Sequence, residues 1–169
     1  MRDLLTGLPT FPDLDAIAAD GELAALFVDV DSFIWLNDQC GHEVGDHALV
    51  TISVELTRIF GTTGTTRIFR VAGDSFLVVL PAVDVDPIDA ALRVVEAIRA
   101  LNIPYRRLDR PDRTRLEVNI VVVRLTAQRL SQCSGTTDIA GNDADLWAGL
   151  VYREKLRNGG QPGVVVDAR

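Results

Sequence analysis

The chain has 169 residues, of which 47% are hydrophobic, and this predicts a single domain over residues 1–169 with one buried core. Its formal net charge of −7 at pH 7, with no basic stripe, excludes a nucleic-acid polymer as partner but allows a nucleotide held through metal ions. Two cysteines exclude a disulfide scaffold, and no apolar run is long enough to span a membrane, so we expect a cytoplasmic protein with no membrane segment in this chain.

The first strand is predicted over Glu22–Val30, after a loop and a short helix at about Asp13–Ala19. Its apolar run, with β-branched and aromatic residues, is typical of a strand in a sheet that helices cover. Asp29 and Asp31 lie at the end of this strand, where a carboxylate is costly to bury unless a positive group meets it. We therefore expect Asp29 to bind a metal ion and Asp31 to cap the helix that follows.

A polar loop is predicted next, at Asn37–Gly45, and apolar residues at helical spacing then predict a helix over Asp46–Phe60. Two further apolar runs, Arg67–Val71 and Phe76–Leu80, are separated by the short segment Ala72–Ser75. This order of strand, tight turn and strand predicts a β-hairpin.

The remaining elements continue the alternation of helices and strands. They are a helix from Asp86-Pro87 to Leu101, strands at Ile103–Leu108 and Arg115–Leu125, a polar loop at Thr126–Gly141, a weaker helix at Asn142–Arg157 and a final edge strand at Gly163–Asp167. Helices that alternate with strands, together with one hairpin, predict an α/β sandwich with a mixed sheet.

Three ordered motifs resemble the GGDEF domain, the diguanylate cyclase family, over nearly the whole chain. They are LTGLP at Leu5–Pro9, the run DVDSFIWLND followed by GHEVGD at Asp29–Asp46, and RVAGDSF at Arg70–Phe76. The resemblance implies a ferredoxin-like palm, an α/β fold with a central mixed sheet flanked by helices, that joins two GTP molecules into cyclic di-GMP. In that family each monomer holds one GTP and two monomers meet face to face, so catalysis implies a homodimer.

The resemblance implies metal ligands at Asp29, the backbone carbonyl of Val30, and Asp74, with Asp29 and Asp74 as the catalytic residues. Divalent ions, Mg²⁺ or Mn²⁺, held by strand-end carboxylates would stabilise the charge that builds on the phosphoryl oxygens when a ribose hydroxyl attacks an α-phosphate. Gly73 would let the turn backbone approach phosphate closely. Without the other two motifs, the segment Ala72–Ser75 would be an ordinary turn.

Asn37 and Asp46 match the guanine-reading positions of the family. A carboxylate can accept both the N1–H and the 2-amino group of guanine, whereas adenine has no such donor pair, so Asp46 should favour guanine. From the residues alone, capping of the helix that Asp46 begins is an alternative. The resemblance adds nucleotide contacts at Phe33, Gly73, Ser75 and Lys155.

Departures from the family's pattern bear on activity. Ser75 stands where the second acidic residue of the signature belongs, Ile34 stands where the family has a lysine near the triphosphate, and the change to Ala72 is mild. Thr63–Thr66 carries no charge where the family has its Arg-x-x-Asp product-inhibition motif. We therefore expect a domain that binds GTP through divalent metal with weak or lost cyclase activity. The alternatives are an inactive nucleotide-binding domain that signals through a partner, and a cyclase that makes another purine dinucleotide.

Overall fold

A computed structural model describes residues 2–10, 23–61, 66–81, 85–105, 114–125, 163 and 165–168 of the chain. Four sequence predictions lie outside these residues: the helix at Asp13–Ala19, the loop at Thr126–Gly141, the helix at Asn142–Arg157 with Lys155, and most of the segment Thr63–Thr66.

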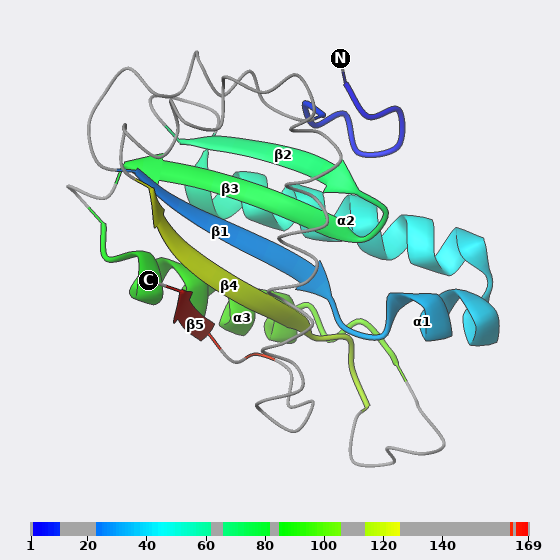
Figure 1. The fold of residues 1–169 in the computed structure, drawn as a ribbon. Helices are drawn as coiled ribbons and strands as arrows, with labels where there is room; N and C mark the ends of the chain where they lie inside the picture. Colours follow the sequence, from blue (N-terminus) through cyan, green and yellow to red (C-terminus); the bar gives the residue numbers. More distant parts are fainter. Residues whose placement is uncertain are drawn as a thin grey trace.

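Within the described residues, five strands form one sheet in the order β2-β3-β1-β4-β5 (Figure 1). The elements are β1 (Leu23–Val30), α1 (Phe33–Cys40), α2 (His42–Phe60), β2 (Arg67–Ala72), β3 (Ser75–Pro81), α3 (Pro87–Ala100), β4 (Val118–Leu125) and β5 (Val165–Ala168). The pair β4–β5 is parallel and the other neighbouring pairs are antiparallel, so the prediction of a mixed sheet with a final edge strand is confirmed.

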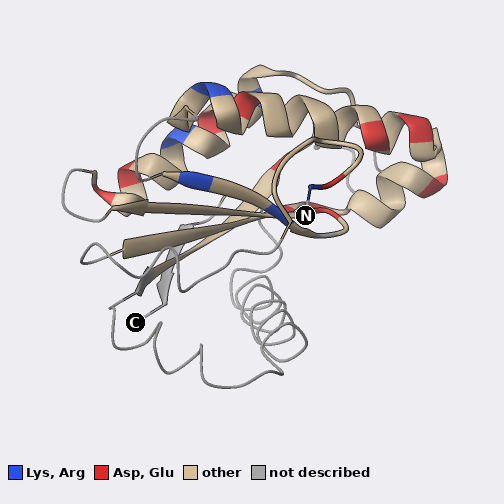
Figure 2. Cartoon of the chain, turned by 90° about the horizontal axis from the view of Figure 1, so that it is seen from above, with Lys and Arg blue, Asp and Glu red and all other residues tan. Residues whose placement is uncertain are grey.

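The helices α2 and α3 cover one face of the sheet, as Figure 2 shows from above. Side chains of β1 alternate between two buried clusters: Leu26 and Val28 pack with α2 and α3, whereas Phe27 packs with Phe69 on the other face. Because both faces of β1 are buried, its sequence is a continuous apolar run rather than an alternating one. None of the described helices is long and apolar enough to cross a bilayer.

The prediction of a loop at Asn37–Gly45 is wrong over most of its length. Asn37 lies inside the short helix α1, and α2 begins at His42, four positions before the predicted start at Asp46. The reason is that α1 buries a single side chain, Leu36, and so has no apolar stripe for a periodic pattern to reveal. Gly41, at a φ of 90°, separates the two helices.

Two smaller predictions are also wrong. The N-cap of α1 is Ser32 rather than Asp31, and its side chain makes no capping hydrogen bond. The strand predicted at Ile103–Leu108 is reduced, in its described part, to one isolated bridge between Pro104 and Arg115, because proline has no N–H for a ladder. The cap of α3 is as predicted: the Asp86 carboxylate accepts a hydrogen bond from the Ile88 N–H at 2.8 Å.

Candidate nucleotide and metal site

The end of β1 and the turn between β2 and β3 lie side by side. The register of β1 against β3 pairs Asp29 with Ser75. The Val30 N–H donates to the Asp74 carbonyl at 3.3 Å, and the Ser75 hydroxyl donates to Asp29 Oδ1 at 3.3 Å. The residues that the sequence predicts as metal ligands, Asp29, Val30 and Asp74, are therefore neighbours in the structure, with the Asp74 backbone beside Val30 and the Ser75 hydroxyl on Asp29.

The donor set at this point suits a hard divalent cation. Two half-buried carboxylates and a nearby backbone carbonyl supply oxygen ligands, which Mg²⁺ and Mn²⁺ prefer. In the part of the chain that the structure describes, no group of three or more His, Cys, Asp or Glu side chains could hold a metal by itself. A cation here would therefore need water and substrate phosphate to complete its coordination, as Mg²⁺ sites for nucleotides usually do.

The turn itself depends on a glycine and an arginine. Gly73 is exposed at a φ of 47°, and a Cβ added there would meet no atom within 4 Å, so the backbone conformation rather than space requires glycine. The Arg70 guanidinium donates to the Gly73 carbonyl from Nε at 3.2 Å and from an Nη atom at 2.7 Å. The sequence analysis did not predict this contact.

Arg70 also reaches the first turn of the chain. Its other Nη atom lies 2.9 Å from the Asp3 carboxylate, which accepts further hydrogen bonds from the Thr6 N–H and hydroxyl. Burial raises the pKa of Asp3. The hydrogen bonds that Asp3 accepts from Thr6 and Arg70, together with the positive charge of Arg70, lower it by more, so the pKa lies below its usual value. Arg70 is the first residue of the RVAGDSF motif and Asp3 lies two residues before the LTGLP motif, but no local pattern links positions 67 residues apart.

The predicted guanine-reading residues lie where α1 packs against α2. A Cβ on Gly45 would overlap the Asn37 side-chain oxygen and lie 3.1 Å from the Phe33 ring, so glycine is what lets the two helices approach this closely. Asn37 Oδ1 is buried there and has no hydrogen-bond partner within the described structure. An unsatisfied buried oxygen costs about 1–3 kcal/mol, and a contact with a ligand is one way in which such a group is satisfied.

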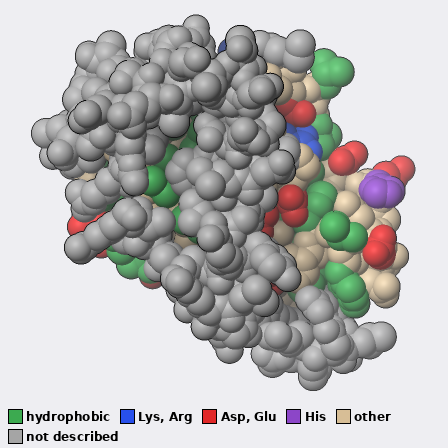
Figure 3. Space-filling view, in the orientation of Figure 1, with side chains coloured by type: hydrophobic (Ala, Val, Ile, Leu, Met, Phe, Trp, Pro, Cys, Tyr) green, Lys and Arg blue, Asp and Glu red, His purple; other side chains and the backbone are tan. Residues whose placement is uncertain are grey.

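Asp46 follows Gly45 directly, so its carboxylate lies on the same stretch of α2 as the Asn37 contact. Asp46 is exposed and lies inside α2, whose N-cap is Gly41. The alternative that Asp46 caps the helix is therefore wrong. Figure 3 shows acidic and histidine side chains gathered at the end of the molecule where α1 and α2 meet, and the exposed residues there include Asp38, His42, Glu43 and Asp46.

The junction between β1 and α1 combines a strained backbone with an apolar surface. Ser32 has a φ of 57°, a value that residues other than glycine rarely adopt. Such strained residues are often found at functional sites. The Asp31 carboxylate lies 3.4 Å from the Asn119 side-chain amide and accepts a hydrogen bond from the Ser32 hydroxyl. Phe33 is half-buried, whereas Ile34 is 76% exposed in the first turn of α1.

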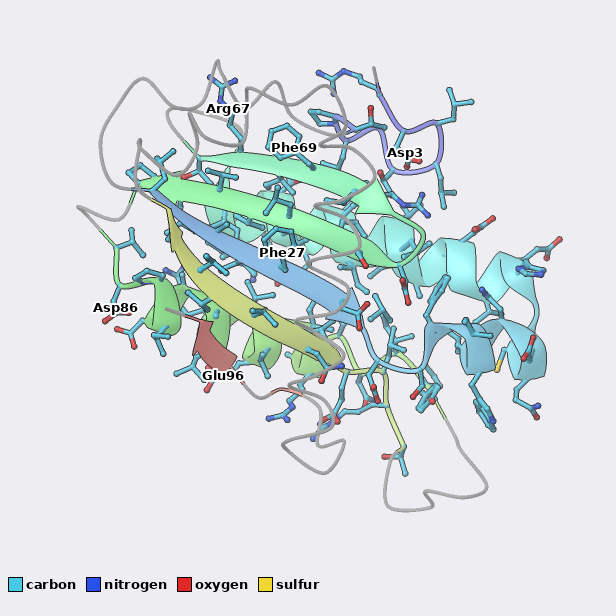
Figure 4. The ribbon with its side chains drawn as sticks, viewed as in Figure 1. Asp3, Phe27, Arg67, Phe69, Asp86 and Glu96 are labelled. Carbon is cyan, nitrogen blue, oxygen red and sulfur yellow. The ribbon has the colours of Figure 1, made fainter. Side chains whose placement is uncertain are left out.

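A separate cavity of about 340 Å³ lies between the N-terminal turn, the end of α2 and β2. Arg2, Thr57 and Arg67 are among its lining residues, and none of the predicted metal or nucleotide residues is. Figure 4 places Arg67 at the opposite end of β2 from Asp3. This cavity is therefore distinct from the site at the β2–β3 turn.

Comparison with known proteins gives the family of the chain. The family model "Diguanylate cyclase, GGDEF domain" matches residues 14–145. The bifunctional diguanylate cyclase/cyclic di-GMP phosphodiesterase MucR of Pseudomonas aeruginosa is 31% identical over 115 residues, which cover 63% of this chain and 16% of MucR. The chain thus spans a small part of that relative's length.

Two solved structures share the fold over almost the whole chain. The GGDEF domain of YfiN (TpbB) from Pseudomonas aeruginosa has a TM-score of 0.67 at 24% identity, with 100% of this chain and 95% of that one covered. The coiled coil and GGDEF domain of DgcB from Caulobacter crescentus, in complex with c-di-GMP, has a TM-score of 0.67 at 17% identity, with 99% and 85% covered. The palm-like α/β fold is therefore confirmed, and the chain belongs to the GGDEF family of diguanylate cyclase domains.

Proposed function

We propose that this domain binds GTP through divalent metal ions at the end of β1 and the β2–β3 turn, and that its diguanylate cyclase activity is weak or lost. The observation that carries the proposal is the register of β1 against β3. It sets Asp29 opposite Ser75 and close to Asp74. Two carboxylates therefore remain near the turn, and the neutral hydroxyl of Ser75 stands where the family has a further acidic residue.

The metal ions would be held by Asp29, Asp74 and the Val30 carbonyl. When bound, Mg²⁺ or Mn²⁺ supplies positive charge to the phosphoryl oxygens of the nucleotide. The Ser75 hydroxyl donates to Asp29, so it orients one metal ligand but adds no charge of its own. Gly73 leaves the turn backbone open on its exposed side, where a phosphate can approach.

The guanine base would be read by Asp46 and Asn37. Asp46 is exposed and can accept from N1–H and the 2-amino group, and the Asn37 side chain lies against Gly45, the residue before Asp46. Phe33 borders the same contact, and Lys155 is the remaining predicted phosphate contact. Adenine lacks the donor pair that Asp46 would accept, which argues against the alternative of another purine dinucleotide.

Weak activity follows from two neutral side chains near the phosphates. Ser75 adds no negative group beside the ions, and Ile34 places an exposed apolar side chain where a lysine would meet the triphosphate. Removing one charged contact from such a site typically costs about 10²–10³-fold in rate. The same residues are compatible with the alternative of an inactive nucleotide-binding domain that signals through a partner.

The proposal is tested by incubation of concentrated protein with GTP and Mg²⁺ or Mn²⁺, followed by mass spectrometry of the products. We expect little or no cyclic di-GMP, and any rate should rise steeply with protein concentration because two monomers must face each other. A rate equal to that of an active cyclase assayed alongside would contradict the claim of weakened activity.

A further inference from the structure

We propose that Asp3 and Arg70 are positioning residues for the metal and nucleotide site. Together with Thr6 and Gly73 they form what we call the clasp, through which the first turn of the chain fixes the β2–β3 turn. The effect on metal affinity rests on the proposed function, whereas the effect on the turn can be measured without any ligand.

The clasp is built around the Arg70 guanidinium, which bridges two segments. One Nη atom lies 2.9 Å from Asp3 Oδ2, while Nε and the other Nη donate to the Gly73 carbonyl at 3.2 and 2.7 Å. The Arg70 side chain is 14% exposed and the Asp3 side chain 21%, so water screens the pair less than it screens a surface ion pair. Only arginine has a rigid fork of donors that can hold both acceptors at once.

Asp3 is itself held rigidly. Its Oδ2 accepts from the Thr6 N–H at 2.7 Å and the Thr6 hydroxyl at 2.6 Å, and its backbone N–H donates to the Leu8 carbonyl at 2.8 Å. The segment after this first turn of the chain is also bound to β2, because the Arg70 N–H donates to the Pro9 carbonyl at 3.0 Å. The carboxylate is therefore a fixed anchor for Arg70 rather than a mobile surface group.

The β2–β3 turn needs such an anchor. The strand ladder is irregular between Arg70 and Ala72, just before the turn, so regular pairing does not fix the backbone there. Two successive carbonyls are instead held from outside the turn: Gly73 by Arg70, and Asp74 by the Val30 N–H at the end of β1. If the clasp is lost, one of these two restraints disappears and the Asp74 backbone is held less firmly beside Val30 at the end of β1.

The test uses three variants of the full chain. Asp3→Asn keeps the shape of the anchor and removes its charge, and Arg70→Lys keeps a charge but removes the fork. Glu55→Gln is the matched control, since Glu55 is also a shielded carboxylate, paired with Arg58 at 2.6 Å, but within α2. For each variant, thermal unfolding, amide hydrogen exchange at Val30 and affinity for Mn²⁺·GTP are measured.

We expect faster exchange at Val30 and a loss of Mn²⁺·GTP affinity of about tenfold in Asp3→Asn and Arg70→Lys, as for outer-shell partners of metal sites. Glu55→Gln should lower the unfolding temperature and leave both the exchange at Val30 and the affinity for Mn²⁺·GTP unchanged. Unchanged exchange at Val30 in both clasp variants would overturn the inference, as would wild-type affinity in both. If the wild-type chain bound no Mn²⁺·GTP, the proposed function would fall, together with the affinity claim, while exchange at Val30 would still decide whether the clasp fixes the turn.

Discussion

The two ends of the proposed nucleotide site differ in what they keep of the family's pattern. At the guanine end, Asn37 and Asp46 match the family, and Gly45 lets α2 pack closely against Asn37 of α1. At the phosphate end, Asp29 and Asp74 are kept, but Ser75 and Ile34 are neutral where the family has charges. In the proposed function, base recognition and phosphate chemistry depend on different elements of the fold, so the proposal predicts that substitutions can alter one without the other.

The largest effect is expected from removal of a metal ligand. Asp74→Ala should lower the affinity for Mn²⁺·GTP by at least about 100-fold, since Asp29 alone cannot anchor the ions. Folding should be unaffected, because Asp74 is a half-buried residue in a turn rather than a core residue. Calorimetry measures the affinity, and circular dichroism is the control for folding. Wild-type affinity in Asp74→Ala would show that the metal site lies elsewhere.

The next prediction restores a charge at the phosphate end. Ser75→Glu should raise cyclic di-GMP formation by about 10–100-fold, because it adds a carboxylate beside ions that the site must hold. Mass spectrometry of the products measures the gain. Ser75→Ala is the matched control, since it removes the hydrogen bond to Asp29 without adding charge. If Ser75→Glu stayed inactive while Ile34→Lys alone restored activity, the phosphate contact rather than the turn would be limiting.

The guanine end is tested by the preference for GTP over ATP. Asp46→Ala should reduce this preference by about tenfold or more, because hydrogen bonds to a charged acceptor contribute about 1.5–3 kcal/mol. Competition of both nucleotides for the metal-loaded protein measures it. Asp38→Ala is the matched control: it removes another exposed carboxylate, which lies on α1 rather than on α2, and should leave the preference unchanged. A preference that survives in Asp46→Ala would refute the guanine assignment.

The smallest effect is a pH dependence of stability that comes from Asp3. Because the pKa of Asp3 is lower in the folded chain than its usual value of 3.8, its contribution to stability is present above that value and is lost as the pH falls through the folded pKa. Denaturant unfolding of wild type and Asp3→Asn, from pH 6 down to pH 3, should therefore show a difference in the free energy of unfolding that shrinks below pH 4. A difference that grows toward acid would mean that the carboxyl is not paired as described.

Local signals in the sequence predicted those elements that are marked by an apolar run, by a short turn segment between two such runs, or by a capping residue. The apolar run of β1, the hairpin around Gly73 and the Asp86 cap of α3 are of this kind. The short helix α1 was missed because it buries only Leu36, and the start of α2 was misplaced because its first three residues, 42–44, are exposed and add nothing to the apolar pattern.

The candidate metal residues were assigned in two ways: Asp29 from its place at a strand end as well as from a motif, and Asp74 from its motif. The sheet register explains why these residues, 45 positions apart in the sequence, lie at the same end of the sheet. The Asp3–Arg70 ion pair was not predicted, because a contact between distant segments leaves no periodic pattern in the sequence. The Gly45 contact was missed because it depends on how closely two helices pack, which no single segment encodes.

The central claim, metal-dependent recognition of GTP, is tested most directly by a calorimetric titration of the wild-type chain with GTP and with ATP. Each titration is carried out with Mg²⁺ and again after chelation of the metal. The account predicts that GTP binds with Mg²⁺, that binding is lost on chelation, and that ATP binds at least about tenfold more weakly. Equal affinity for the two nucleotides, or GTP affinity that does not change on chelation, would contradict it.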